Sequence, residues 1–165
     1  MWYNKFTFYE KQPGLPELPP DNFFSQPLTE EEAALYPHIT KFHPEFLDKN
    51  KYPVPSALTL PDELLQLLRY SNGGSLINGE REFGYFSVQN IRLYYFGYGF
   101  PKYTPSLLPI AFNGGGVFYT YDFRDPANVD LVAVSAGDLD YASAVGIGKT
   151  IDEVLSRTTN IEDRL

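Results

Sequence analysis

Two pairs of closely spaced carboxylates are the residues of this chain best suited to acid–base chemistry. Asp122 lies three residues before Asp125, and Asp138 lies two residues before Asp140. Two carboxyl groups that meet in a cleft can act as general acid and general base. Their spacing along the chain does not show that they converge, and both Asp122, at a predicted strand end, and Asp138, after Gly137, occupy ordinary turn positions. We therefore expect structural or solvated roles for them and no enzymatic activity.

Two further patterns could bind a metal or a phosphate, and each has a simpler explanation. His38 and His43 are five residues apart, Pro44 breaks any helix that would align them, and the chain has no cysteine to complete a ligand set. Gly114–Gly116 could cradle a phosphate, but a phosphate loop leads into a helix, whereas Val-Phe-Tyr follows here and favours a strand. The sequence therefore predicts no metal and no cofactor.

The composition predicts a single domain with a large aromatic core. The chain has 165 residues, among them 13 Tyr, 13 Phe and one Trp, and a chain of this size buries about 70% of its unfolded surface. The absence of cysteine excludes disulfides and fits a reducing compartment. The first residues do not have the pattern of a secretory signal, and no stretch is apolar enough to cross a membrane. We expect a cytoplasmic protein.

The net charge of −8 is concentrated in the last third of the chain. Residues 120–165 carry 9 acidic and 4 basic side chains, whereas residues 61–119 carry 4 of each. Nucleic-acid binding needs clustered Lys and Arg, which this sequence lacks. An acidic surface can instead attract a basic protein partner, although it can also serve solubility alone.

The first sixty residues predict an aromatic edge strand, a connector and a short helix. Residues 2–9 alternate partly between apolar and polar types, and the prolines of residues 13–20 exclude regular structure. Thr29 and Glu32 form a capping box, which predicts a helix that begins at this point. Residues 60–74, LPDELLQLLRYSNGG, predict a second helix with Pro61 in its first position, a leucine face, and positive-φ residues at its end.

The remaining pattern predicts mainly strands. Residues 83–87 favour a strand, after which Ser87 caps a short helix, and residues 95–103 are predicted to form a loop. Their aromatic side chains are either an exposed recognition patch or a lid on the core, and we favour the lid. Further strands are predicted at residues 107–112, 117–122, 129–134 and 141–147, with a last helix capped by Thr150 and Glu153. The predicted class is α+β with a mainly antiparallel sheet flanked by helices.

The order of these blocks resembles the SUKH superfamily, which includes yeast cell-wall-synthesis regulators and many bacterial immunity proteins. In that family a Leu-Pro helix that ends in Asn-Gly-Gly precedes a strand with Pro-Ile-Ala, a glycine turn and a strand that ends in Asp. The matching positions here are Leu60, Pro61, Asn72, Gly73, Gly74, Pro109, Ile110, Ala111, Gly115, Gly116 and Asp122. The resemblance covers about residues 57–165, and we therefore expect a SUKH-like domain over these residues. Residues 1–56 are expected to form an accessory segment that packs on this domain.

The resemblance implies a protein-interaction module that neutralises a cognate bacterial toxin, for which a nuclease is one candidate class. An acidic inhibitor can imitate the phosphates that such a toxin grips, and the candidate contacts are Asp122, Asp125, Asp130, Asp138 and Asp140. The alternative is a small-ligand-binding or regulatory domain linked to cell-wall synthesis. Its pocket would be lined by Tyr94, Tyr98, Tyr103, Tyr119 and Tyr121. Direct nucleic-acid and membrane partners are not expected.

Overall fold

One antiparallel sheet of seven strands forms the centre of the molecule, with the strands arranged in the order of the sequence. The computed structural model describes residues 1–26, 28–35, 37, 41, 44–48, 50–79 and 81–157. The strands are β1 (Thr7–Lys11), β2 (Gly74–Asn78), β3 (Arg81–Tyr85), β4 (Leu107–Phe112), β5 (Val117–Asp122), β6 (Asp130–Ser135) and β7 (Val145–Gly148). Every neighbouring pair is antiparallel.

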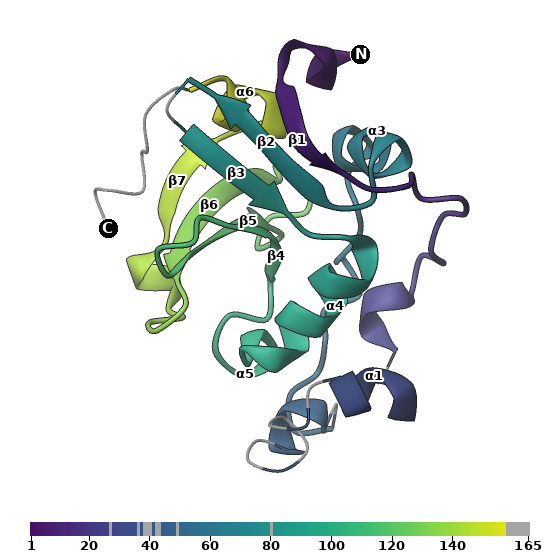
Figure 1. The fold of residues 1–165 in the computed structure, drawn as a ribbon. Coiled ribbons are helices and arrows are strands. Elements are labelled where there is room, and N and C mark those ends of the chain that lie inside the picture. The colour runs from purple at the N-terminus through teal and green to yellow at the C-terminus, as the bar shows by residue number, and fades with distance from the viewer. Residues whose placement is uncertain are drawn as a thin grey trace.

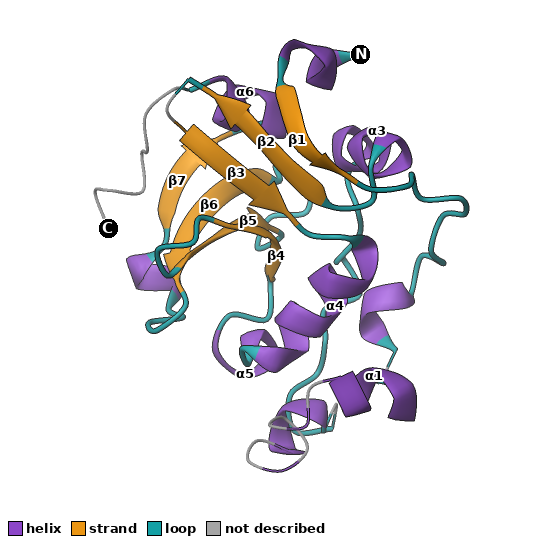
Figure 2. Cartoon of the chain, viewed as in Figure 1, coloured by secondary structure: helices purple, strands orange, loops and turns teal. Residues whose placement is uncertain are grey.

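Helices cover the sheet on both faces and at its ends (Figures 1 and 2). The α-helices are α1 (Glu30–Leu35), α3 (Asp62–Tyr70), α4 (Val88–Gly97), α5 (Phe100–Tyr103) and α6 (Ile151–Ser156). Short 3-10 helices are η1 (Trp2–Lys5), η2 (Phe23–Ser25), η3 (Pro44–Leu47) and η4 (Tyr141–Ser143). The predicted α+β class with a mainly antiparallel sheet is therefore confirmed.

Side chains that alternate along β5 define the two faces of the sheet. On the α3 face, Tyr119 stacks on Phe83 at 4.9 Å and Tyr121 reaches Glu63 at the start of α3. On the α4 face, Phe118 contacts the rings of Tyr98 at 4.8 Å and Phe100 at 5.5 Å. Strands β4, β5 and β6 are buried on both faces, which explains why their sequences are apolar almost throughout.

The helix that was predicted most completely, α3, forms because its leucines share one face. Leu64, Leu67 and Leu68 are fully buried, and the helix ends at Tyr70. Pro61 is the N-cap residue instead of the first helical residue. The predicted end at positive-φ residues is wrong, because Ser71 ends the helix in an extended conformation. Gly73 follows with φ of +84°, and Gly74, with φ of +152°, is already the first residue of β2, a strand that the sequence analysis did not predict.

The N-terminal segment adds the edge strand β1 to the sheet through its pairing with β2. Residues 2–5 are a 3-10 helix where a strand was predicted, because the strand starts only at Thr7. The predicted capping box is confirmed, since Thr29 and Glu32 exchange hydrogen bonds of 3.2 and 3.1 Å. The second oxygen of Glu32 accepts a 2.8 Å hydrogen bond from Arg92 of α4, which attaches this segment to the rest of the fold. The division at residue 57 stays a prediction.

The predicted loop at residues 95–103 is wrong, because helix α4 continues to Gly97 and α5 follows after Gly99. Gly99 has φ of +81°, a conformation that glycine adopts at little cost and that turns the chain between the two helices. Tyr95, Phe96 and Phe100 are buried as the lid requires, whereas Tyr98 and Tyr103 are exposed as a recognition patch would be. The cap by Ser87 is confirmed by a 3.2 Å hydrogen bond from the Asn90 amide.

The strands β4 to β7 and the helix α6 follow the predicted order, with differences in their bounds. Strands β4 and β5 form the predicted hairpin, and β6 pairs along the whole of β5. The strand predicted at 141–147 is shorter, because η4 precedes β7. Thr150 caps α6 as predicted, although the Glu153 carboxylate accepts from the amide of Lys149 instead of that of Thr150.

Candidate functional site

The five aspartates predicted as partner contacts lie at the ends of β5 and β6 and in the loops that follow these strands. Asp122 is directly opposite Asp130 at one end of the β5–β6 pair. Asp138 instead bridges to Ser135 at the other end of β6, and Asp140 follows it. The sequence analysis placed all of them in the acidic last third, and the register of the strands puts Asp122 and Asp138 at opposite ends of the β5–β6 pair.

Asp122 is paired with the nearest cation. Arg124 Nη2 lies 2.7 Å from Asp122 Oδ2, and the Arg124 backbone amide donates to Asp122 Oδ1 at 3.0 Å. Partial burial opposes ionisation of Asp122, but the hydrogen bonds and charge of Arg124 outweigh it and hold the pKa of this carboxyl below its usual value. The guanidinium of Arg124 also lies 4.7 Å from the ring centre of Tyr141, which ties the two loops together. Asp122 therefore offers little uncompensated charge.

The other carboxylates also have local structural partners. Asp125 accepts from the amide of Ala127 at 3.1 Å, which closes a turn. Asp138 Oδ2 accepts from the Ser143 hydroxyl at 2.8 Å, and Asp140 caps η4 through the Ala142 amide at 2.9 Å. The bond of Asp125 stabilises the loop between β5 and β6, and those of Asp138 and Asp140 stabilise the loop between β6 and β7.

The five predicted pocket tyrosines are divided between the two faces of the sheet. Tyr119 and Tyr121 are 1% exposed and lie on the α3 face. Tyr94 and Tyr98 lie on the opposite face, where both rings contact Phe118. Because neighbouring residues of a strand point to opposite sides, the structure does not bring all five into one pocket.

The two buried tyrosines, Tyr119 and Tyr121, have polar partners that the sequence analysis did not identify. Tyr121 donates a 2.6 Å hydrogen bond to Glu63, and the same carboxylate oxygen accepts from the Ile151 amide at 2.9 Å. Burial, with the Glu63 charge beside it, raises the pKa of Tyr121 well above its ordinary value. Tyr119 accepts a 2.9 Å hydrogen bond from the buried Arg81. These contacts join α3, β3, β5 and α6.

Two buried arginines were also missed. Arg81 donates to the Val154 carbonyl near the end of α6, and Arg92 lies over the ring of Phe23 at 5.2 Å. Each is 4% exposed or less. The only sequence signal was a single arginine inside an apolar stretch, as in Ile-Arg-Leu-Tyr-Tyr, and such a residue is usually exposed.

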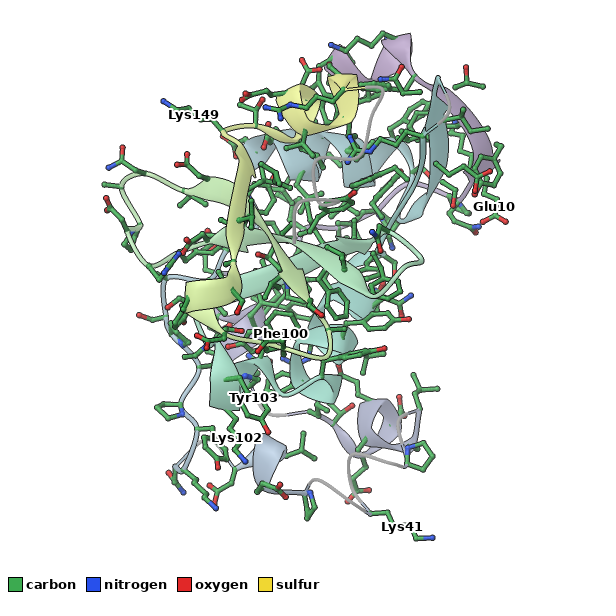
Figure 3. The ribbon with its side chains drawn as sticks, turned by 90° about the vertical axis from the view of Figure 1, so that its left-hand side faces the viewer. Glu10, Lys41, Phe100, Lys102, Tyr103 and Lys149 are labelled. Atoms are coloured by element: carbon green, nitrogen blue, oxygen red, sulfur yellow. The ribbon has the colours of Figure 1, made fainter. Side chains whose placement is uncertain are left out.

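The α4 face carries a groove that combines members of both predicted sets. It has a volume of about 350 Å³ and is lined by Tyr98, Tyr103 and residues 136–139, which include Asp138. Tyr98 is 40% exposed and Tyr103 is 49% exposed. We name it the tyrosine–aspartate groove. Figure 3 views this side of the molecule and labels Tyr103 on α5.

A larger open cleft, of about 510 Å³, lies between residues of β2 and β3 and the first turns of α4. Its lining includes Asn72, Gly73, Gly74, Ser87, Asn90 and Tyr94. We name it the glycine cleft. A side chain at Gly74 would lie 2.6 Å from the Glu10 carbonyl oxygen, and one at Gly73 would lie 2.8 Å from the Ser87 nitrogen. Both glycines are therefore required by close backbone packing.

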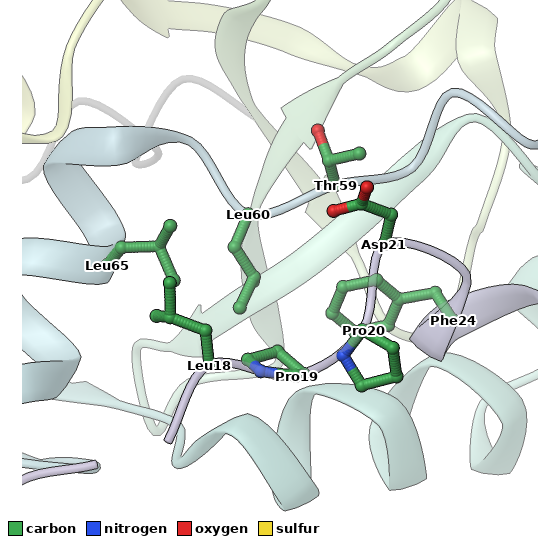
Figure 4. A pocket seen from close by; sticks show the side chains of 8 residues that line it. All are labelled: Leu18, Pro19, Pro20, Asp21, Phe24, Thr59, Leu60 and Leu65. Atoms are coloured by element: carbon green, nitrogen blue, oxygen red, sulfur yellow. The ribbon is translucent and has the colours of Figure 1, made fainter. Parts of the chain in front are cut away.

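A third hollow, of about 100 Å³, lies between the proline-rich connector and the chain that enters α3 (Figure 4). Leu18, Leu60 and Leu65 give it apolar walls, and the side chains of Asp21 and Thr59 add polar atoms. It is too small for more than a few atoms of a ligand, and it belongs to the packing of the connector on α3.

His38 and His43 lie outside the described residues. Within the part of the chain that is described, no group of three or more His, Cys, Asp or Glu side chains is arranged to hold a metal ion. No helix among these residues is both long and apolar enough to cross a membrane.

Comparison with known protein families identifies the family of this chain. A sequence model of the SMI1/KNR4 family (SUKH-1) matches residues 57–157, which is more than half of the chain. The match includes α3, the tyrosine–aspartate groove and the lining of the glycine cleft except Glu10 and Gln12. No curated protein matches the sequence.

Proposed function

This chain belongs to the SMI1/KNR4 family (SUKH-1), and on that premise we propose that it is a non-enzymatic protein-interaction module. In this proposal it is a cytoplasmic immunity protein that binds and neutralises a cognate bacterial toxin. The observation that carries the proposal is the tyrosine–aspartate groove, where two tyrosines are exposed beside an acidic loop. Tyrosine is favoured at protein interfaces because it combines a large apolar ring with a polar hydroxyl.

The charge of the chain supports a basic partner and, among toxins, favours a nuclease. A nuclease surface that grips phosphates is positive, and a protein of net charge −8 is attracted to it over a distance. Asp125, Asp130, Asp138 and Asp140 remain candidate contacts. Asp122 is the weakest of the five candidates, since Arg124 already neutralises it.

The proposal is tested by expressing the chain together with the product of the neighbouring gene, because immunity proteins are normally encoded beside their toxins. We expect the two proteins to purify as a complex and the cells to survive a toxin that kills when expressed alone. We also expect the association rate to fall as salt is raised. No complex and no rescue would contradict the function, whereas a salt-independent rate would contradict only its electrostatic part.

A second candidate function, a small-ligand-binding or regulatory domain linked to cell-wall synthesis, is favoured by the glycine cleft. Tyr94 lies there beside the polar side chains of Asn72, Ser87 and Asn90, and a few polar groups on an aromatic wall are typical of ligand sites. A small-molecule screen followed by amide chemical shifts of Gly73, Gly74 and Gly84 tests this function. Binding that leaves these amides unchanged would contradict it.

A further inference from the structure

The two rings of the tyrosine–aspartate groove are held in place from behind. Tyr98 contacts Phe118 of β5 at 4.8 Å and stacks on Tyr94 at 5.7 Å. Tyr103 ends α5, which is fixed by the buried Phe100. The ring of Tyr98 is thus anchored on the core and Tyr103 is carried by a helix that packs there, while 40–49% of each residue stays exposed. Such preorganised rings can bind a partner with little loss of side-chain entropy.

The opposite wall of the groove is equally fixed. The amide of Asp138 donates to the Ser135 carbonyl at 3.1 Å, and Asp138 Oδ2 accepts from Ser143 at 2.8 Å. Within the described part of the chain, Asp138 Oδ1 accepts no hydrogen bond. The groove therefore combines two exposed aromatic rings with a positioned carboxylate that has a free acceptor oxygen.

This combination matches the chemistry of a guanidinium group. Arginine stacks flat on aromatic rings and donates forked hydrogen bonds to carboxylates, whereas a lysine ammonium offers only a point charge. Lys102 Nζ lies 5.1 Å from the ring centre of Tyr103, a cation–aromatic contact between adjacent residues of the chain. We propose that the groove binds an arginine side chain of a protein partner, stacked on Tyr98 or Tyr103 and paired with Asp138.

This inference rests on the proposed interaction function and names the contact that the partner supplies. Arginine is enriched among the few residues that dominate binding energy at interfaces. Removing one ring or the carboxylate is expected to weaken binding by about three- to thirtyfold, since a cation–aromatic or paired-charge contact of this kind has that effect on affinity.

The first test uses the isolated protein and a capped Gly-Arg-Gly peptide, followed by amide chemical shifts. We expect saturable shifts at residues 136–139 and at Tyr98 and Tyr103, and much smaller shifts with the citrulline peptide, which has the same shape without the charge. Equal shifts with both peptides, no shifts, or shifts confined to the glycine cleft would overturn the inference.

The second test uses variants of the full chain. Tyr98→Leu, Tyr103→Leu and Asp138→Asn should each weaken binding of the arginine peptide, while Tyr9→Leu should not. Tyr9 is a suitable control because it is 51% exposed on β1, at the opposite edge of the sheet from β7. Far-ultraviolet circular dichroism checks that each variant is folded.

The same variants separate this inference from the proposed function. If the wild-type chain binds the neighbouring toxin and the three groove variants bind it equally well, the arginine site is wrong while the immunity function stands. If the wild-type chain binds no toxin but the groove takes the arginine peptide as described, the function is wrong and the site stands.

Discussion

Tyrosines on the two faces of the sheet have the same chemistry but opposite environments. Tyr119 and Tyr121 are 1% exposed and bonded to Arg81 and Glu63. Tyr98 and Tyr103 are 40% and 49% exposed and line a groove. The hydroxyl of a buried tyrosine needs a polar partner, whereas that of an exposed one is satisfied by water. The first pair therefore stabilises the fold, and the second pair is available for recognition.

The largest effect is expected at Tyr119. Tyr119→Ala removes a ring that stacks on Phe83 and leaves the buried Arg81 with one hydrogen bond fewer. We expect the free energy of unfolding to fall by about 3–5 kcal/mol. Urea unfolding followed by circular dichroism measures this change, and a loss below about 1 kcal/mol would show that the α3 face is not the stabilising one.

The next effect is expected at Tyr121, where only one hydroxyl is removed. Tyr121→Phe deletes the 2.6 Å hydrogen bond to Glu63, while the Ile151 amide still donates to that carboxylate. Hydrogen bonds to charged groups are worth about 1.5–3 kcal/mol, and we expect a loss in this range. A double-mutant cycle with Glu63→Ala, which removes the acceptor, isolates the pair, and additive losses would contradict direct coupling.

A third prediction concerns pH and Tyr85, another tyrosine of the α3 face. Burial raises the pKa of Tyr85 to about 12 from 10.0, although the side chain of Ser71 counteracts part of this. The folded state keeps the phenol neutral while the unfolded chain ionises it, so stability is complete below pH 10 and falls as pH rises towards 12. This group alone is expected to cost about 1.4 kcal/mol by pH 11.

Unfolding free energies measured from pH 8 to pH 11 test this dependence. The decrease with pH should be shallower in Tyr85→Phe than in the wild type, since the phenylalanine cannot ionise. Parallel pH profiles for the two proteins would contradict the prediction.

The smallest effect on stability is expected at Tyr103. Tyr103→Ala removes a side chain that is half exposed, and the free energy of unfolding should change by less than about 1 kcal/mol. The same variant should lose affinity for the arginine peptide. A stability loss comparable to that of Tyr119→Ala would show that the two faces do not differ as described.

The sequence predicted those elements whose signals are local. The capping box of Thr29 and Glu32, the leucine face of α3 and the hairpin of β4 and β5 depend on residues a few positions apart. Strand β2 was missed because the glycine and polar residues of Gly-Ser-Leu-Ile-Asn resemble a turn, and only pairing with β1 and β3 makes them a strand. The last turn of α4 and the whole of α5 were missed because two glycines within an aromatic stretch favour a loop.

The sequence by itself determined the α+β class, the acidic charge, the family resemblance and the residue types available for recognition, because composition and periodicity are properties of the chain alone. Only the tertiary structure decided which of those residues meet. Alternation along β5 placed Tyr119 and Tyr121 away from Tyr98, and the β6–β7 loop brought Asp138 to the exposed rings. The physical reason is that contacts across a sheet depend on strand register and on the side covered by each helix, which no local pattern specifies.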